Sequence, residues 1–115
     1  MDKNSAVYVK VGDLKPSFMN INTIVKVVNV GLPRFISSGR DRSERQIADA
    51  LVGDETGSII LTLWEKQIGR IKAGDTLEIR NGYTSLFKGS LRLNVGGKGT
   101  LEKVDKEIEN VNLRN

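Results

Sequence analysis

The run Ile21-Asn22-Thr23-Ile24-Val25-Lys26-Val27-Val28-Asn29-Val30 decides the fold class. Six of its ten residues are valine or isoleucine, whose branched Cβ atoms favour an extended backbone. Apolar side chains occupy both the odd and the even positions, whereas a strand with one solvent face alternates strictly. The pattern predicts one long strand that bends and serves two sheets of a small barrel. A strand covered on both faces in a sandwich would show the same pattern.

Further strand-forming segments follow at short spacing and are separated by glycine-containing turns. They span residues 46–52, 58–64, 76–83, 90–95 and 100–104. Five or six short strands with turns of this kind predict an all-β barrel or sandwich. We expect a five-stranded Greek-key barrel.

The connections between these segments differ in composition. Residues 53–57, Gly-Asp-Glu-Thr-Gly, contain the residue types that tight reversals require and are predicted to form a hairpin loop. Residues 65–72 place Ile68 and Ile71 on one side at helical spacing, with Gly74 beyond them. A short helix is therefore predicted between the third and fourth strands.

Residues 31–43 are predicted to form a long basic loop between the first two strands. They contain Pro33, Gly39, three serines and few apolar side chains. The loop is basic because its single acidic residue is outnumbered by Arg34, Arg40 and Arg42.

The length of 115 residues suits one domain, which we expect to span residues 1–104, followed by a polar, frayed tail at 105–115. The formal net charge of +4 and a sequence pI near 9.5 favour a polyanionic partner. From 98 to 115 four basic and four acidic residues cancel, so the net charge lies on residues 1–97.

The chain contains no cysteine and no histidine, which excludes disulfides, thiolate metal sites and the commonest general base. Its acidic residues are scattered, and it has no nucleotide-binding or nucleophile motif. We expect a protein without enzymatic activity, cofactor, metal or small-molecule substrate. It has neither a signal-peptide pattern nor an apolar run of the ~18 residues that a membrane span needs. A cytoplasmic, nucleoid-associated protein is the expectation.

The segment Ser58-Ile59-Ile60-Leu61-Thr62-Leu63-Trp64 indicates where a binding surface lies. Its period of two places Ile59, Leu61 and Leu63 on one face and Trp64 on the other. If the aliphatic face is the core, Trp64 points outward. The alternative is that this lone tryptophan packs in the core, which is common in small domains.

Two further aromatic residues can be placed on the same surface. Strict alternation would send Tyr83 inward with Leu77 and Ile79, but a bulge at Gly82 would reset its side. Phe87 is predicted to lie in a loop between the fourth and fifth strands, with the cation of Lys88 beside it. The alternative for Tyr83 and Phe87, as for Trp64, is that the ring packs in the core.

Exposed aromatic rings beside lysine and arginine suit single-stranded nucleic acid. An unpaired base offers a π-face for stacking, at ~1–3 kcal/mol per base, and the phosphates require positive charge. The predicted nucleic-acid-binding residues are Trp64, Tyr83, Phe87, Lys88, Ser85, Arg34, Lys66, Arg80 and Arg92. Because every base has a π-face, such a surface would show little sequence preference.

At these residues the sequence resembles the archaeal single-stranded DNA-binding proteins that consist of one OB fold, relatives of the OB domains of replication protein A. The matching stretches are Val11-Gly12-Asp13-Leu14-Lys15-Pro16, Val52-Gly53-Asp54-Glu55-Thr56-Gly57, Leu61-Thr62-Leu63-Trp64, Tyr83 and Phe87-Lys88-Gly89. They cover roughly residues 11 to 97. The hairpin and the strand that ends in tryptophan are fairly specific only in combination.

The resemblance implies an OB fold and base stacking by Trp64, Tyr83 and Phe87. The family commonly has a second tryptophan where this chain has Tyr83, which implies a weaker stack. Crenarchaeal members carry a tail used for protein partners that this chain lacks, so recruitment of replication or repair proteins is not implied. Two rival functions remain: an RNA-binding OB module, because stacking does not discriminate against the 2′-OH, and an OB domain used only for protein contact.

Overall fold

The computed structural model describes residues 7–37 and 44–113. Within them the elements are a 3₁₀ turn η1 (Val11–Asp13) and seven strands. The strands are β1 (Ile21–Val30), β2 (Arg34–Ser37), β3 (Glu44–Asp54), β4 (Gly57–Trp64), β5 (Thr76–Phe87), β6 (Ser90–Asn94) and β7 (Thr100–Val104). The all-β prediction is confirmed, but the described residues form seven strands where five were expected. No helix in this part of the chain is long and apolar enough to cross a membrane.

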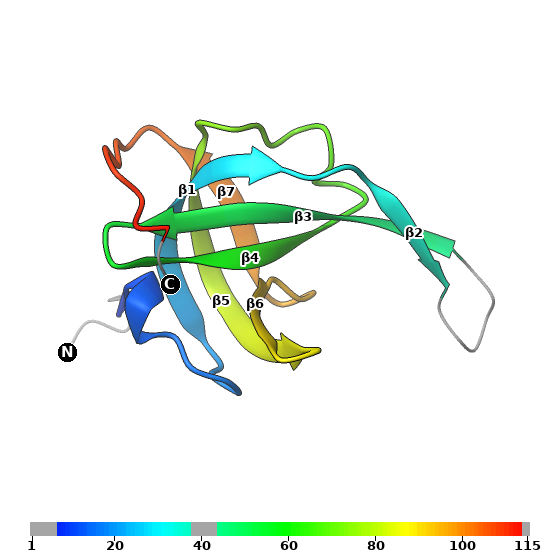
Figure 1. The fold of residues 1–115 in the computed structure, drawn as a ribbon, viewed down its shortest axis with the longest axis horizontal. Coiled ribbons are helices and arrows are strands. Elements are labelled where there is room, and N and C mark those ends of the chain that lie inside the picture. Colours follow the sequence, from blue (N-terminus) through cyan, green and yellow to red (C-terminus); the bar gives the residue numbers. More distant parts are fainter. Residues whose placement is uncertain (1–6, 38–43, 114–115) are drawn as a thin grey trace.

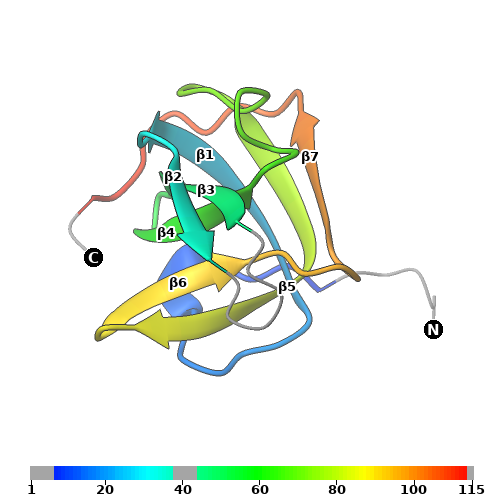
Figure 2. The same cartoon turned by 90° about the vertical axis from the view of Figure 1, so that its right-hand side faces the viewer.

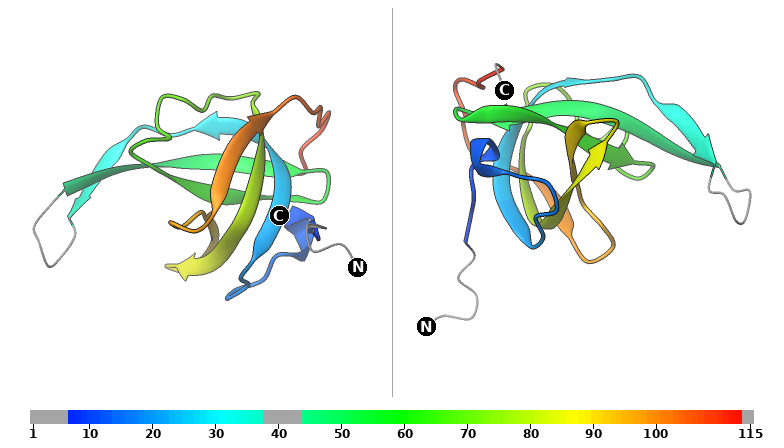
Figure 3. Two further views of the ribbon diagram at one scale, coloured as in Figure 1. Left: turned by 180° about the vertical axis from the view of Figure 1, so that it is seen from behind. Right: turned by 60° about the horizontal axis from the view of Figure 1, so that its bottom comes forward.

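The strands form one sheet in the order β1-β3-β4-β6-β5-β7, and β5 also pairs with β1 (Figure 1). The pairing of β4 with β6 is parallel and the others are antiparallel. β2 pairs with the first part of β3, and together they project from the rest of the sheet as a two-stranded arm (Figure 3). The view along this arm shows β6 and the second part of β5 below β2 and β3 (Figure 2).

β1 serves two partners, as its apolar pattern predicted. Its first half pairs with β5 and its second half with β3, and Lys26 pairs with both. The register with β3 shifts between Val27 and Asn29, so Val28 is an extra residue that bends the strand. The core lies inside this curvature. Its fully buried side chains include Val25, Val27, Val52, Leu61, Leu63, Leu77, Ile79 and Leu93.

The predicted helix between the third and fourth strands is wrong. Residues 65–70 form successive turns: the Trp64 carbonyl accepts from the N–H groups of Gln67 and Ile68, and the Gln67 carbonyl accepts from Arg70. Gly69 has a φ of +86°, which a right-handed helix does not accommodate. The predicted common side is nevertheless correct, because Ile71 is buried in the core and Ile68 packs against it.

Two predicted loops contain strand. Residues 34–37, inside the predicted 31–43 loop, form β2 because β3 begins at Glu44 and offers them a hydrogen-bonding partner. Residues 38–43, with Arg40 and Arg42, lie outside the described residues. The placement of Phe87 in a loop is also wrong, since β5 continues through it. The reversal to β6 is confined to Lys88 and Gly89, whose φ angles of +52° and +81° are those of a type I′ turn.

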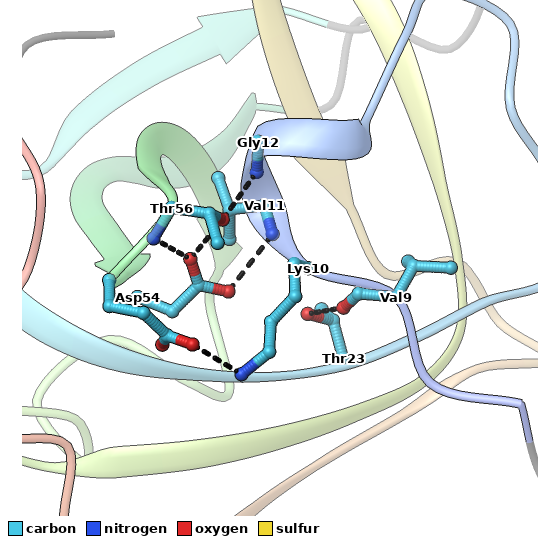
Figure 4. A network of polar contacts seen from close by, with 8 residues as sticks. Val9, Lys10, Val11, Gly12, Thr23, Asp54 and Thr56 are labelled. Atoms are coloured by element: carbon cyan, nitrogen blue, oxygen red, sulfur yellow. Dashed lines mark hydrogen bonds and ion pairs between the residues drawn. The ribbon is translucent and has the colours of Figure 1, made fainter.

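A buried carboxylate fixes the β3–β4 hairpin, which forms where it was predicted (Figure 4). Asp54 is 1% exposed. Its Oδ2 accepts from the Val11 N–H at 2.9 Å, and its Oδ1 accepts from the N–H and hydroxyl of Thr56 at 2.8 and 2.5 Å. The Thr56 Oγ1 in turn accepts from the Gly12 N–H at 2.8 Å. The hairpin is thereby tied to η1. Asn112, in the predicted tail, donates its N–H to the Asp54 carbonyl.

We expect Asp54→Asn to destabilise the protein while keeping its side-chain volume. An amide has only one acceptor oxygen, so one of the N–H groups of Val11 and Thr56 would face an NH₂ group. The loss should be about 1–3 kcal/mol in the free energy of unfolding, measured by urea denaturation. The matched control is Glu55→Gln, which removes only the exposed ion pair with Lys10 and should leave the unfolding midpoint nearly unchanged. Equal midpoints for the two variants would contradict this role of Asp54.

Candidate nucleic-acid interface

A bulge in β5 reverses which of its side chains face outward. Ile21 of β1 pairs with Gly82, whereas Thr23 pairs with Ile79, so β5 has one extra residue between these pairs. Asn81, just before Gly82, has a φ of +57°. Before the bulge the odd-numbered residues of β5 are buried, and after it the even-numbered ones are, up to Thr84. The predicted reset of alternation near Gly82 is confirmed.

The reversal places three side chains of β5 on the outer face: Tyr83, Ser85 and Phe87. Gly82 allows the strand to do this, because a Cβ at this position would lie 3.0 Å from the Asn94 carbonyl oxygen and 3.1 Å from Ile79. Tyr83 is 39% exposed and Phe87 50% exposed.

β4 presents Trp64 on its outer face, as predicted. Trp64 is 37% exposed, whereas Leu61 and Leu63 are fully buried. In the register with β3, Trp64 lies opposite Ile47, and opposite residues of an antiparallel pair project to the same face. The Trp64 backbone N–H donates to the Gln67 side chain at 3.1 Å, which holds the chain where β4 ends.

β6 joins the outer faces of β4 and β5. Arg92 of β6 pairs with Ile60 of β4 on one side and with Ser85 of β5 on the other. Tyr83 pairs with Asn94, whose side-chain amide donates to the Ser85 hydroxyl at 2.9 Å. One continuous surface therefore carries the three aromatic residues, and we call it the aromatic face (Trp64, Tyr83, Phe87).

Trp64 and Tyr83 line a common hollow of about 410 Å³. Its other lining residues are Ile36, Arg45, Val95, Gly96 and Gly97. The arm of β2 and β3 thus forms one side of the hollow and the connection from β6 to β7 forms another. A Cβ at Gly96 would lie 3.4 Å from the Tyr83 ring, an ordinary van der Waals distance, so the backbone passes beside the ring.

Phe87 is accompanied by two cations. The Lys88 Nζ lies 5.4 Å from the centroid of its ring and the Arg92 Cζ lies 5.1 Å from it. These distances are within the range of cation–π attraction. The type I′ turn positions Lys88 directly after the ring, and β6 returns Arg92 to it.

An acidic residue that the sequence analysis did not single out connects the basic ones. Asp49 of β3 accepts from the Arg92 NH1 at 2.9 Å, and its other oxygen lies 3.3 Å from the Arg34 NH1. The Arg92 side chain is only 17% exposed. We call this arrangement the cross-strand bridge (Arg34, Asp49, Arg92), because it links β2, β3 and β6.

Two of the predicted basic residues are not part of this surface as the structure shows it. Arg80 precedes the bulge, pairs with Glu78 at 3.2 Å and lines a different hollow beside β7. The Tyr8 hydroxyl, which donates to Glu78, and the Arg80 guanidinium hold the pKa of Glu78 below its usual value. Lys66 is exposed in the turns after Trp64 and does not line the hollow.

The residues that the sequence analysis missed come from the arm. Ile36 and Arg45 pair with each other and line the hollow. Phe35 pairs with Gln46 and so lies on the opposite face of the arm, although it is 66% exposed. An alternation signal was available for Arg45, because with Ile47 and Asp49 it continues the outer face of the predicted 46–52 strand by one step. Nothing comparable marked Ile36.

Comparison with known proteins identifies the relatives of the chain. Residues 14–103 match the family model described as single-stranded DNA binding protein Ssb-like, OB fold. The chain is 40% identical over 98 residues to the single-stranded DNA binding protein Ssb of Saccharolobus solfataricus, covering 85% of this chain and 65% of that protein. The chain therefore spans slightly less than two thirds of that relative.

Solved structures agree with the sequence comparison. A hypothetical protein from Arabidopsis thaliana superposes with a TM-score of 0.79 at 32% identity, covering 100% of this chain and 85% of the other. The second OB-fold domain of replication protein A from Methanococcus maripaludis superposes with a TM-score of 0.70 at 25% identity, covering 90% of this chain and 100% of that domain. The predicted OB fold and the resemblance are confirmed: the chain belongs to the Ssb-like family of single-stranded DNA-binding proteins with an OB fold.

Proposed function

We propose that this protein binds single-stranded DNA with little sequence preference, stacking bases on the aromatic face while basic side chains neutralise phosphates. The observation that carries the proposal is the convergence of Trp64, Tyr83 and Phe87 on one outer surface, although they come from two strands, β4 and the part of β5 after its bulge. Rings left half exposed on one face are expensive for folding alone and suit stacking with unpaired bases.

The charges of the surface fit a polyanion. Arg45 lines the hollow together with Trp64 and Tyr83, and Lys88 lies over the ring of Phe87. A cation is therefore present at both parts of the aromatic face. The polar side chains on this surface make a hydrogen bond within the protein: the Asn94 amide donates to the Ser85 hydroxyl. That hydrogen bond leaves fewer groups to recognise the edges of particular bases. Stacking is indifferent to base identity, which favours binding without sequence selection.

In the cell, a protein of this kind would cover exposed single strands during replication, repair or recombination, without enzymatic activity of its own. Its ligand is proposed to be DNA in the cytoplasm at the nucleoid. Recruitment of replication or repair proteins would require surfaces other than the aromatic face, which the strand would occupy.

The roles of the rings are tested by Trp64→Ala and Phe87→Ala. Each should weaken oligo-dT binding by ~1–3 kcal/mol, the cost of one base stack, with little change in melting temperature. Binding of the parent and of Phe87→Ala can be followed by fluorescence, since Trp64 is the only tryptophan; Trp64→Ala needs a labelled oligonucleotide. The control is Leu61→Ala, a fully buried residue, which should lose about 2–5 kcal/mol of folding stability. A Trp64→Ala protein that binds as tightly as the parent would refute this site.

Salt dependence tests the phosphate contacts. For single strands, log affinity should fall against log salt by roughly 0.7 per neutralised phosphate, and about three to five such contacts are expected. Lys88→Gln should make the slope shallower by about 0.7. Arg80→Gln removes the same charge from a side chain that faces Glu78 outside the aromatic face and should leave the slope unchanged. Equal changes in both variants would mean that only net charge matters.

Competition between DNA and RNA oligonucleotides of equal length tests the nature of the ligand. We expect DNA to compete better at the same salt concentration. Stacking and phosphate contacts alone do not discriminate against the 2′-OH, which leaves an RNA-binding alternative open. Better competition by RNA would favour that alternative. Absence of any response to either oligonucleotide would favour an aromatic face that contacts protein.

A further inference from the structure

The cross-strand bridge places a negative charge where a bound strand needs positive charge. The Asp49 Oδ1 accepts from the Arg92 NH1 at 2.9 Å and from the Arg34 NH2 at 3.4 Å, and its Oδ2 lies 3.3 Å from the Arg34 NH1. Asp49 is opposite Thr62 of β4, on the face that carries Trp64. Its carboxylate would repel phosphates, and it already occupies two of the arginines on this surface.

The bonding of Arg92 within the bridge is incomplete. Only its NH1 donates to Asp49, and the buried Nε–H has no acceptor among the described residues. A buried donor without an acceptor is unfavourable. The Asp49 Oδ1 is shared between both arginines, whereas a phosphate offers more acceptor oxygens in the geometry that guanidinium groups bind well.

We propose that Arg34 and Arg92 form a phosphate-binding subsite that Asp49 occupies in the free protein, so that Asp49 competes with the backbone of the strand and limits its affinity. This inference rests on the proposed function. The carboxylate keeps two arginines ordered in the absence of ligand, and one of them, Arg92, lies beside Phe87. When a phosphate enters, one or both guanidinium groups transfer from Asp49 to it. Asp49 thereby determines affinity without contributing an attractive contact.

The test is Asp49→Asn, which removes the charge and preserves the shape. Its affinity for oligo-dT at low salt should rise about five- to tenfold, the effect of removing one like charge at contact distance. The slope against salt should steepen by roughly 0.7 for each phosphate that gains an arginine. The matched control is Glu102→Gln on β7, which changes the net charge equally from an exposed position away from the aromatic face; it should alter affinity less than twofold. Asp49→Ser, a second neutral variant, should reproduce the gain.

Dependence on the arginines is tested by a double-mutant cycle. In an Arg34→Gln background, Asp49→Asn should give a clearly smaller gain than in the parent. Three outcomes would overturn the proposal that Asp49 competes with phosphate. They are an equal gain in both backgrounds, a gain no larger than that of Glu102→Gln, and weaker binding of folded Asp49 variants. If the parent protein itself fails to bind oligo-dT, the proposed function is overturned and this inference with it; the two failures are therefore distinguishable.

Discussion

The extra residue in β5 before Gly82 is the constraint on which the aromatic face depends. In a strand of constant alternation the odd-numbered residues all face the same side, so Leu77 and Ile79 could not be buried while Tyr83 and Phe87 are exposed. The left-handed conformation of Asn81 lets one strand do both. The same twelve residues then pair with β1 and β7 through their first part and with β6 through their second. A part of the core and a part of the aromatic face are thus built from one continuous segment.

Folding interactions and candidate ligand contacts lie at opposite ends of β4. The buried Asp54 network holds its beginning, next to Gly57, through backbone N–H groups of η1. Trp64 is at its other end, where strand pairing gives way to turns. The half-exposed Trp64 side chain is therefore separated from the buried network along the length of β4. This separation is typical of proteins whose binding residues are positioned by a rigid scaffold.

The sequence predicted most of the sheet because its signals were local. The double apolar parity of Ile21–Val30 and the alternation that turns Trp64 outward both follow from strand geometry, and both are confirmed. The failures have two causes: pairing partners elsewhere in the sequence, and a local backbone conformation that the residue types did not indicate. β2 exists because β3 extends to meet it, and residues 65–72 turn instead of forming a helix because Gly69 adopts a positive φ. Asp49 was overlooked since its significance depends on arginines 15 and 43 positions away.

The last described stretch of the chain has a geometric consequence for handling the protein. The Asn112 N–H donates to the Asp54 carbonyl beside the β3–β4 hairpin. The length of β4 separates this hairpin from Trp64. Eight residues of β4 at about 3.3 Å each make that separation roughly 25 Å. A tether or affinity tag attached after this stretch would leave the molecule from the side remote from the hollow. Immobilised in that orientation, the protein would present its aromatic rings to the solution.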